Sequence, residues 1–301
     1  MPQQAQRPPT PPQATVDTEI TCRQCRYLLR GLHLESRCPE CGLAVWDTII
    51  DLIDPASSHL PRLRDPIGVG NALLWLMGCA LAAVLLVIAR PVAMQLDRFD
   101  PAQLDRVSAL APPWLTAVAG MLVLAGLWSA WKFRPGRTSQ TPPSVHADVR
   151  ALAGGLVIFG VMLVSIGVLG PWPEPTVESL LLKLGAVGGA CLALYGMRGI
   201  MATIGKRSRE YRTSRGGRQR ATEMIFAALA AGVGLLVQHV AFPYRETVPV
   251  YAVGMTLTWI SMLMLVIGLA YMLVNAWWIR RALRTPPPRL AEIIGPAPAS
   301  P

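Results

Sequence analysis

Charged residues are scarce in this chain of 301 residues, where Asp, Glu, Lys and Arg together make up only 15%. An ordinary soluble domain contains roughly a quarter of such residues. Hydrophobic residues account for 52%, so the chain has ample apolar surface and is not intrinsically disordered. The composition also excludes a small secreted disulfide-rich protein, and it predicts a protein whose surroundings are mainly lipid.

Motifs of the common catalytic sites are also missing: the chain contains no G-x-x-x-x-G-K-[ST], no H-E-x-x-H and no G-x-S-x-G. No Asp or Glu lies in the middle of a long apolar run, which argues against an ion-coupled transporter. The first 20 residues hold no apolar run of the kind found in a secretory signal. We therefore expect no enzyme activity, and the sequence names no substrate.

Six long apolar stretches are present, and a helix needs about 20 apolar residues to cross the hydrocarbon core of a bilayer. Some windows, such as Ala80 to Ile88, are apolar on every face, whereas a buried helix of a soluble protein normally keeps a polar stripe. The pattern predicts an all-α transmembrane bundle over residues 66–281. We expect spans at about 68–89, 113–131, 151–170, 180–200, 223–243 and 250–279.

Basic residues are divided unequally among the segments outside these spans. The N-terminal segment, the second and fourth loops and the C-terminal tail hold 23 Lys and Arg residues, whereas the other three loops hold four. Loops rich in Lys and Arg stay on the cytoplasmic side of the membrane. We therefore expect a multi-pass protein with both termini in the cytosol.

The fourth loop carries most of the net charge of +10. Its basic side chains would contact anionic lipid headgroups, which stabilises the bound state by about 1 kcal/mol for each residue near the surface. The charge thus follows from topology and does not favour nucleic-acid binding, for which Tyr211 is the loop's only stacking ring. The candidate lipid-contact residues are Lys206, Arg207, Arg209, Arg212, Arg215, Arg218 and Arg220.

Four of the six cysteines form two C-x-x-C pairs, Cys22 with Cys25 and Cys38 with Cys41, separated by twelve residues. Two such pairs close a tetrahedral site of four thiolates, typical of structural zinc. Disulfides are the alternative, but the reducing cytosol favours metal binding. We expect a zinc ribbon of short β-hairpins over residues 21–43, in which Zn²⁺ supplies most of the folding energy.

Two runs of residues carry a family resemblance: Cys22-x-x-Cys25-x-Tyr27-Leu28-Leu29-Arg30-Gly31-Leu32 and Cys38-Pro39-Glu40-Cys41-Gly42. Together they resemble the N-terminal zinc ribbon of a group of uncharacterised bacterial multi-pass membrane proteins. The resemblance covers only about Thr21 to Leu43 and implies a zinc ribbon, with no known activity. It leads us to expect the bacterial inner (cytoplasmic) membrane.

The two knuckles also show one departure and one competing resemblance. Arg26 stands where such knuckles often have glycine, which leaves the first turn less clearly defined than the second, where Gly42 suits a positive φ. The second knuckle is also similar to the C-P-x-C-G turn of rubredoxins, which hold iron and transfer electrons. Rubredoxin knuckles are much farther apart in sequence, so zinc is the preferred metal.

The segments flanking the ribbon have distinct patterns. Residues 44–65 form a connector in which Trp46, Ile49, Ile50 and Ile53 recur at the spacing of one helix face. We expect an amphipathic helix packed on the ribbon or on the cytosolic span ends, with an edge strand of the ribbon as the alternative. Residues 1–20 and 282–301 are rich in proline and are expected to be disordered.

Polar residues inside the spans are few. Gln238, His239 and Asn275 form a candidate intramembrane polar site that could line a path for a small solute. For the Gln238–His239 pair the alternatives are a hydrogen bond between helices, which we prefer, and a proton relay. G-x-x-x-G spacings such as Gly185 with Gly189 predict close helix packing and only weakly a homo-oligomer.

These features support three functional hypotheses. The first is an inner-membrane protein that displays its zinc ribbon to a cytosolic protein as an interaction or sensing module. The alternatives are a small-solute transporter or channel, and a membrane enzyme or redox partner that uses the ribbon metal.

Overall fold

The structure of the chain is a computed structural model. It describes residues 14–53, 63, 65–97, 112, 114–133, 143–170, 176–213, 221–245, 249–285, 288 and 290–294. The chain forms two compact units, one from Met1–Pro61 together with Thr285–Pro301 and the other from Arg62–Arg284. Both ends of the chain thus belong to one unit.

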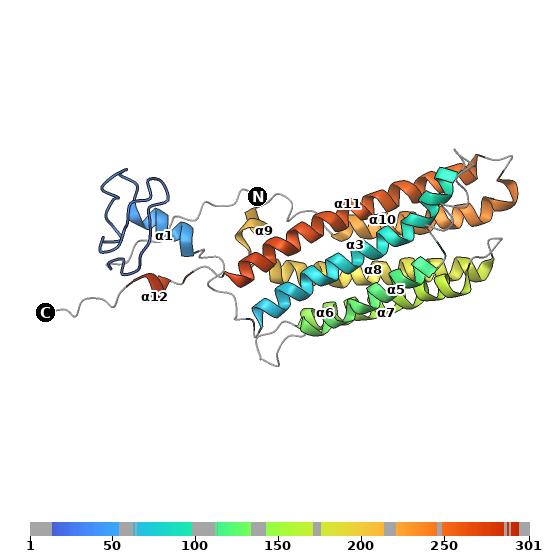
Figure 1. The fold of residues 1–301 in the computed structure, drawn as a ribbon, viewed down its shortest axis with the longest axis horizontal. Helices are drawn as coiled ribbons and strands as arrows, with labels where there is room; N and C mark the ends of the chain where they lie inside the picture. The colour runs from blue at the N-terminus through green and yellow to red at the C-terminus, as the bar shows by residue number, and fades with distance from the viewer. Residues whose placement is uncertain are drawn as a thin grey trace. The chain divides into compact units, whose positions relative to one another are not determined.

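The described residues of the larger unit contain six helical stretches that are long and apolar enough to cross a membrane. They confirm the expected helical bundle and are drawn as long rods in Figure 1. The helices are α3 (Pro66–Asp97), α5 (Trp114–Ala125) with α6 (Leu127–Lys132), α7 (Pro143–Leu169), α8 (Val177–Gly205), α10 (Ala221–Ala241) with η3 (Phe242–Tyr244), and α11 (Val250–Arg284). A short helix, α9 (Arg209–Thr213), follows α8.

The six spans form a ring in chain order. Each helix packs against the next, from α3 through α5, α7, α8 and α10 to α11, and α11 packs in turn against α3. Neighbours run antiparallel: Gly70 near the start of α3 lies against Arg280 near the end of α11. The chain therefore enters and leaves the bundle at the same end.

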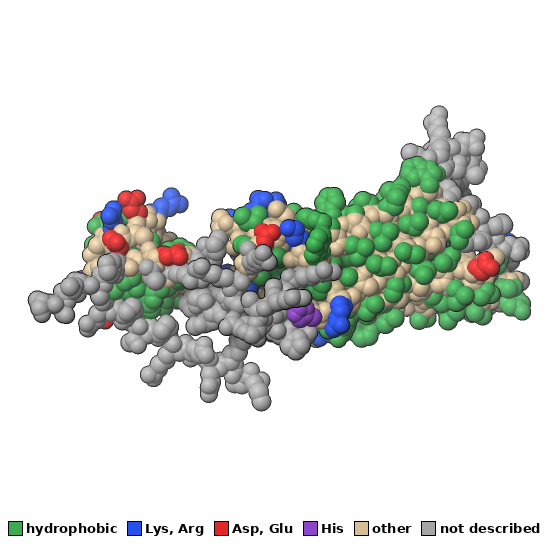
Figure 2. Space-filling view, turned by 90° about the horizontal axis from the view of Figure 1, so that it is seen from below, with side chains coloured by type: hydrophobic (Ala, Val, Ile, Leu, Met, Phe, Trp, Pro, Cys, Tyr) green, Lys and Arg blue, Asp and Glu red, His purple; other side chains and the backbone are tan. Residues whose placement is uncertain are grey.

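The outer surface of the bundle is apolar, as expected for contact with lipid. Large hydrophobic side chains stay exposed on every span, including Trp75, Met121, Phe226 and Leu263, each at least half exposed. Figure 2 shows hydrophobic side chains along the length of the bundle, with the charged side chains that it draws near the ends. Water would make such a surface prone to association, so it supports a multi-pass membrane protein.

Glycines allow the closest helix contacts, as the G-x-x-x-G spacing predicts. A Cβ placed on Gly189 of α8 would lie 2.5 Å from the backbone nitrogen of Phe159 in α7, and one on Gly155 of α7 would lie 2.2 Å from the nitrogen of Ala193. The Gly185 and Gly189 stripe is thus used for packing inside the chain. It gives no separate support to a homo-oligomer.

Several spans extend beyond the limits expected from hydropathy. Helix α3 continues past residue 89 and through Pro91 to Asp97, while α7 begins at Pro143 and α11 ends at Arg284. Backbone pairing within a helix does not need an apolar environment, so the helices extend beyond their apolar segments. The second span is divided at Gly126, whose N–H is shared between the carbonyls of Leu122 (3.2 Å) and Val123 (3.0 Å).

The smaller unit is built around the cysteine ribbon. Its described residues contain four isolated β-bridges instead of longer strands, together with helix α1 (Val45–Ile53) and the short α12 (Leu290–Ile293). The bridges Thr21–Leu28 and Arg37–Ala44 each close one of the expected short hairpins.

Candidate metal centre

The two C-x-x-C knuckles have the same backbone structure. In the first, the N–H of Cys22 donates to the carbonyl of Tyr27 (2.7 Å) and the N–H of Arg26 donates to that of Cys22 (2.9 Å). In the second, the N–H of Cys38 donates to Leu43 (2.7 Å) and that of Gly42 to Cys38 (2.9 Å). Each hairpin therefore turns its two thiols toward the same side.

The residue after each pair lies in the left-handed region. Gly42 has φ 73° and Arg26 has φ 65°, the only positive φ among the described non-glycine residues. The departure from glycine noted in the sequence therefore does not alter the turn. Arg26 adopts the glycine-like conformation in spite of its Cβ.

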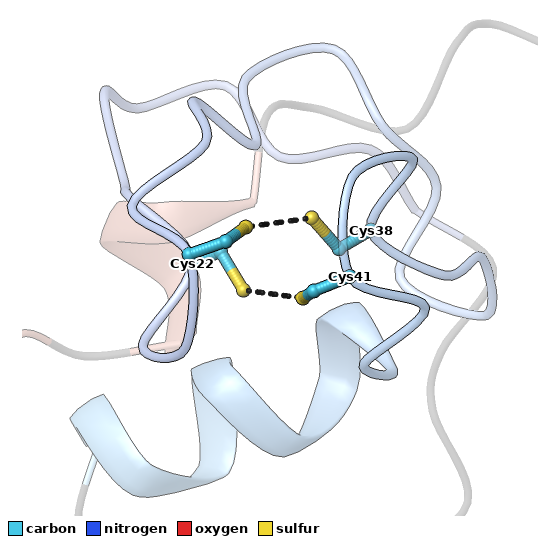
Figure 3. A group of neighbouring side chains, drawn as sticks. Cys22, Cys38 and Cys41 are labelled. Atoms are coloured by element: carbon cyan, nitrogen blue, oxygen red, sulfur yellow. Dashed lines mark hydrogen bonds between the residues drawn. The ribbon is translucent and has the colours of Figure 1, made fainter.

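The four sulfur atoms lie close enough to bind one ion. All four Sγ atoms of Cys22, Cys25, Cys38 and Cys41 lie within 4.8 Å of one another. The sulfurs of Cys22 and Cys41 are 3.6 Å apart and those of Cys25 and Cys38 are 3.5 Å apart. Figure 3 labels Cys22, Cys38 and Cys41 and marks the close sulfur contacts with dashed lines. A tetrahedral Zn–S₄ centre with 2.3 Å bonds needs S–S edges of about 3.8 Å. All six cysteines are free, so the disulfide alternative is not realised.

The thiols are electrostatically coupled. The backbone N–H groups of Cys25 and Gln24 donate toward the sulfur of Cys22 and lower its pKa to about 6. The N–H of Tyr27 likewise lowers the pKa of Cys25. Desolvation and the neighbouring thiols outweigh this effect and raise the pKa of Cys25 to about 12. A divalent cation bound among the four sulfurs would favour the thiolate form of each cysteine.

Helix α1 supports the ribbon from one side. Val45, Trp46, Ile49 and Ile53 are buried in the same cluster as Cys22 and Cys38. Asp51 of α1 also pairs with Arg23 of the first knuckle at 3.4 Å. The prediction of an amphipathic helix packed on the ribbon is confirmed, and the edge-strand alternative is wrong.

The expectation of disordered ends is wrong for part of each end. In the N-terminal leader (residues 1–20), Ala14, Val16 and Ile20 are buried in the same hydrophobic cluster as Cys22 and Cys38. In the C-terminal tail (residues 282–301), Ile293 belongs to this cluster and is only 1% exposed. The proline content of both ends led to the prediction of disorder. The few apolar residues among the prolines are the sequence signal from which this packing could have been predicted. Residues 1–13 and 295–301 lie outside the described part.

The candidate intramembrane polar residues do not form one site. Gln238 of α10 donates to Thr258 Oγ1 (2.7 Å) and to the carbonyl of Gly254 (3.2 Å) in α11, a hydrogen-bond clip between helices. His239, beside it, is half-buried. Asn275 is buried and lies 17 residues beyond Thr258 on α11, about 25 Å along the helix axis. The structure thus places Asn275 far from the other two.

The structure describes only part of the fourth loop, which is the basic loop between α8 and α10. Lys206 and Arg207 follow α8, while Arg209 and Arg212 lie on α9, where Arg212 donates to the carbonyl of Lys206. The half-buried side chain of Tyr211 attaches α9 to the bundle, because it packs over Gly205 and against the hydrophobic core. The remaining three candidates, Arg215, Arg218 and Arg220, lie outside the described residues.

Comparisons with known protein families, curated proteins and solved structures found no match for this chain. The fold and the site define a class by themselves: a multi-pass helical membrane protein with a four-cysteine cluster, able to hold a metal ion, in its terminal unit.

Proposed function

We propose that this protein is a six-span protein of the bacterial cytoplasmic membrane that displays a structural zinc ribbon to the cytosol as an interaction or sensing module. The convergence of four thiols from two equivalent knuckles is the observation that carries this proposal. Four protein ligands would complete a zinc tetrahedron and leave no position for water or substrate. The role that fits such a site is structural.

Metal analysis of the full-length protein in mild detergent tests the choice of metal. We expect about one zinc ion per chain, lost on replacing Cys38 and Cys41 with serine and retained in the control Cys191→Ser, because Cys191 belongs to span α8. Iron with visible absorbance would replace the proposal by a redox role. A protein without bound metal would contradict it.

Reporter fusions at each terminus test the orientation. The excess of basic residues in the terminal segments and the second and fourth loops predicts cytosolic reporters at both ends. A periplasmic N-terminal reporter would overturn the cytosolic ribbon. A cytosolic protein that co-purifies with the wild type but not with the Cys38→Ser, Cys41→Ser variant would support the interaction role.

We also propose that the basic loop binds anionic headgroups. Lys206 and Arg209 are exposed at the end of α8 and on α9, where each charge would attract anionic lipid. Quantifying anionic lipid that co-purifies with the protein tests this. We expect less of it with the Lys206→Gln, Arg209→Gln variant, and equal amounts would contradict the contact.

A further inference from the structure

The backbone of the C-terminal segment pairs with the backbone of the N-terminal leader, as a strand added to the edge of the ribbon would. The N–H of Asp17 donates to the carbonyl of Ile293 (3.0 Å), and Val16 forms an antiparallel bridge with Ile294. On its other side Val16 is already paired with the ribbon, donating to Leu32 (3.0 Å) and accepting from Gly31 (2.7 Å). The tail therefore extends a backbone ladder that begins in the ribbon, as peptides do when they bind by strand addition.

The side chains of the tail complete the ribbon core. Ile293 and Val16 are both 1% exposed, and they share one buried cluster with the metal-site residues Cys22 and Cys38. Leu290 and Ile294 pack against the same cluster. Figure 3 draws α12, in faint red, beside the cysteine cluster, with α1 in pale blue on another side.

The tail has little capacity to fold alone. Helix α12 has only four residues, far fewer than an isolated helix needs in water. Prolines precede it at 286–288 and follow it at 296 and 298, and proline neither donates a backbone hydrogen bond nor fits a helix interior. The short helix is therefore a consequence of docking on the ribbon.

We propose that Leu290–Ile294 is a built-in peptide ligand of the ribbon, and that metal binding and tail docking strengthen one another. This inference rests on the proposed function, since it requires a metal ion in the four-cysteine centre. The tail pairs with Val16 and Asp17, and Val16 is itself bonded to Gly31 and Leu32, in the segment that joins the two knuckles. Ile293 also belongs to the buried cluster that contains Cys22 and Cys38. By linkage, the factor by which the metal tightens docking equals the factor by which the docked tail tightens metal binding.

The linkage has a directional consequence. Removing the metal loosens the knuckles, releases the apolar tail and uncovers Val16, so that one event changes both ends of the chain. The module would thus report metal occupancy through its C-terminal segment, which follows the last span directly in sequence.

A matched pair of truncations tests the inference in the full chain. Deleting residues 290–301 removes the docked segment, whereas deleting 295–301 keeps it. We expect zinc affinity, measured by chelator competition, to fall about tenfold or more in the longer truncation and to stay within about twofold in the shorter one. The point variant Ile293→Asp should behave like the longer truncation, and Ile293→Val like the wild type.

Hydrogen exchange gives a second readout, first in the wild type and then in the longer truncation. Chelating zinc from the wild type should speed exchange at the amide of Asp17, which the tail protects. In the zinc-loaded longer truncation that amide should exchange fast while the amides of Cys22 and Cys38 stay protected. Equal zinc affinity in both truncations, or a protected Asp17 after chelation, would overturn the inference and leave the zinc ribbon intact. A wild type that binds no zinc would instead defeat the proposed function.

Discussion

Arg26 is the residue at which the two knuckles differ most. It is exposed and adopts φ 65°, a conformation that costs a residue with a Cβ roughly 1–2 kcal/mol. We expect Arg26→Gly to stabilise the ribbon by about 1 kcal/mol or slightly less, because glycine also gains freedom in the unfolded chain. Chelator competition on the full-length protein should show zinc bound several-fold more tightly.

Gly42 provides the matched test in the second knuckle. A Cβ there would meet nothing within 4 Å, so Gly42→Ala changes only the backbone strain at φ 73°. We expect it to weaken zinc binding by a factor similar to the gain in Arg26→Gly. If both variants bound zinc like the wild type, the positive φ would not be a source of strain.

Residue-scale features were predictable where they depend on local sequence. The spacing of Cys22, Cys25, Cys38 and Cys41 identified the cluster because two short hairpins are enough to bring the thiols together. The hydrogen bond from Arg280 Nε to Asn71 Oδ1 at 2.7 Å was not predictable, because it depends on which helices become neighbours across the ring.

At the scale of elements, the contact between α7 and α8 depends on one face of glycines. A Cβ on Gly189 would lie 2.5 Å from a backbone nitrogen of α7, which cannot move without shifting the helix, whereas a Cβ on Gly188 meets nothing within 4 Å. We expect Gly189→Ala to destabilise the bundle by about 1–3 kcal/mol, the usual cost of overpacking. Gly188→Ala should be neutral or slightly stabilising, since alanine favours the helix.

Thermal unfolding in detergent, followed by tryptophan fluorescence, measures this difference. A lower midpoint for Gly189→Ala alone would support the close approach of α7 and α8. Equal midpoints for the two variants would mean that the helices separate easily, contrary to the packing observed.

The elements themselves were largely predictable, because apolarity over about 20 residues is a local property. The six spans were found in this way, and α1 was found from the helical spacing of its apolar residues. Their ends were less predictable, as α3 shows by continuing through Pro91. Helix α12 was missed because its four residues carry no periodic signal and become helical through contacts with the distant residues Val16 and Asp17.

At the scale of the whole molecule, the ring of spans explains how both ends of the chain can share one unit. Six antiparallel helices in chain order place the start of α3 beside the end of α11. The segments before and after the bundle therefore leave it at the same end. This geometry is a precondition for a ribbon whose core takes residues from both ends.

A polar contact between α3 and α11 also helps to close the ring. Asn71 Oδ1 of α3 accepts hydrogen bonds from Arg280 Nε at 2.7 Å and Arg284 Nη2 at 3.4 Å in α11. Asn71→Leu removes the acceptor and should lower stability by about 1.5–3 kcal/mol, the range for hydrogen bonds to charged groups. Asn71→Asp keeps an acceptor oxygen and should retain most of the stability.

A double-mutant cycle with Arg280→Met separates this contact from the general effects of substitution. Unfolding free energies in detergent should show a coupling of about 1 kcal/mol or more between positions 71 and 280, with the double variant less destabilised than the sum of the single ones. The cycle measures whether α3 and α11 are held together at this end of the bundle. Additive effects would mean that the hydrogen bond between Asn71 and Arg280 does not contribute to closing the ring.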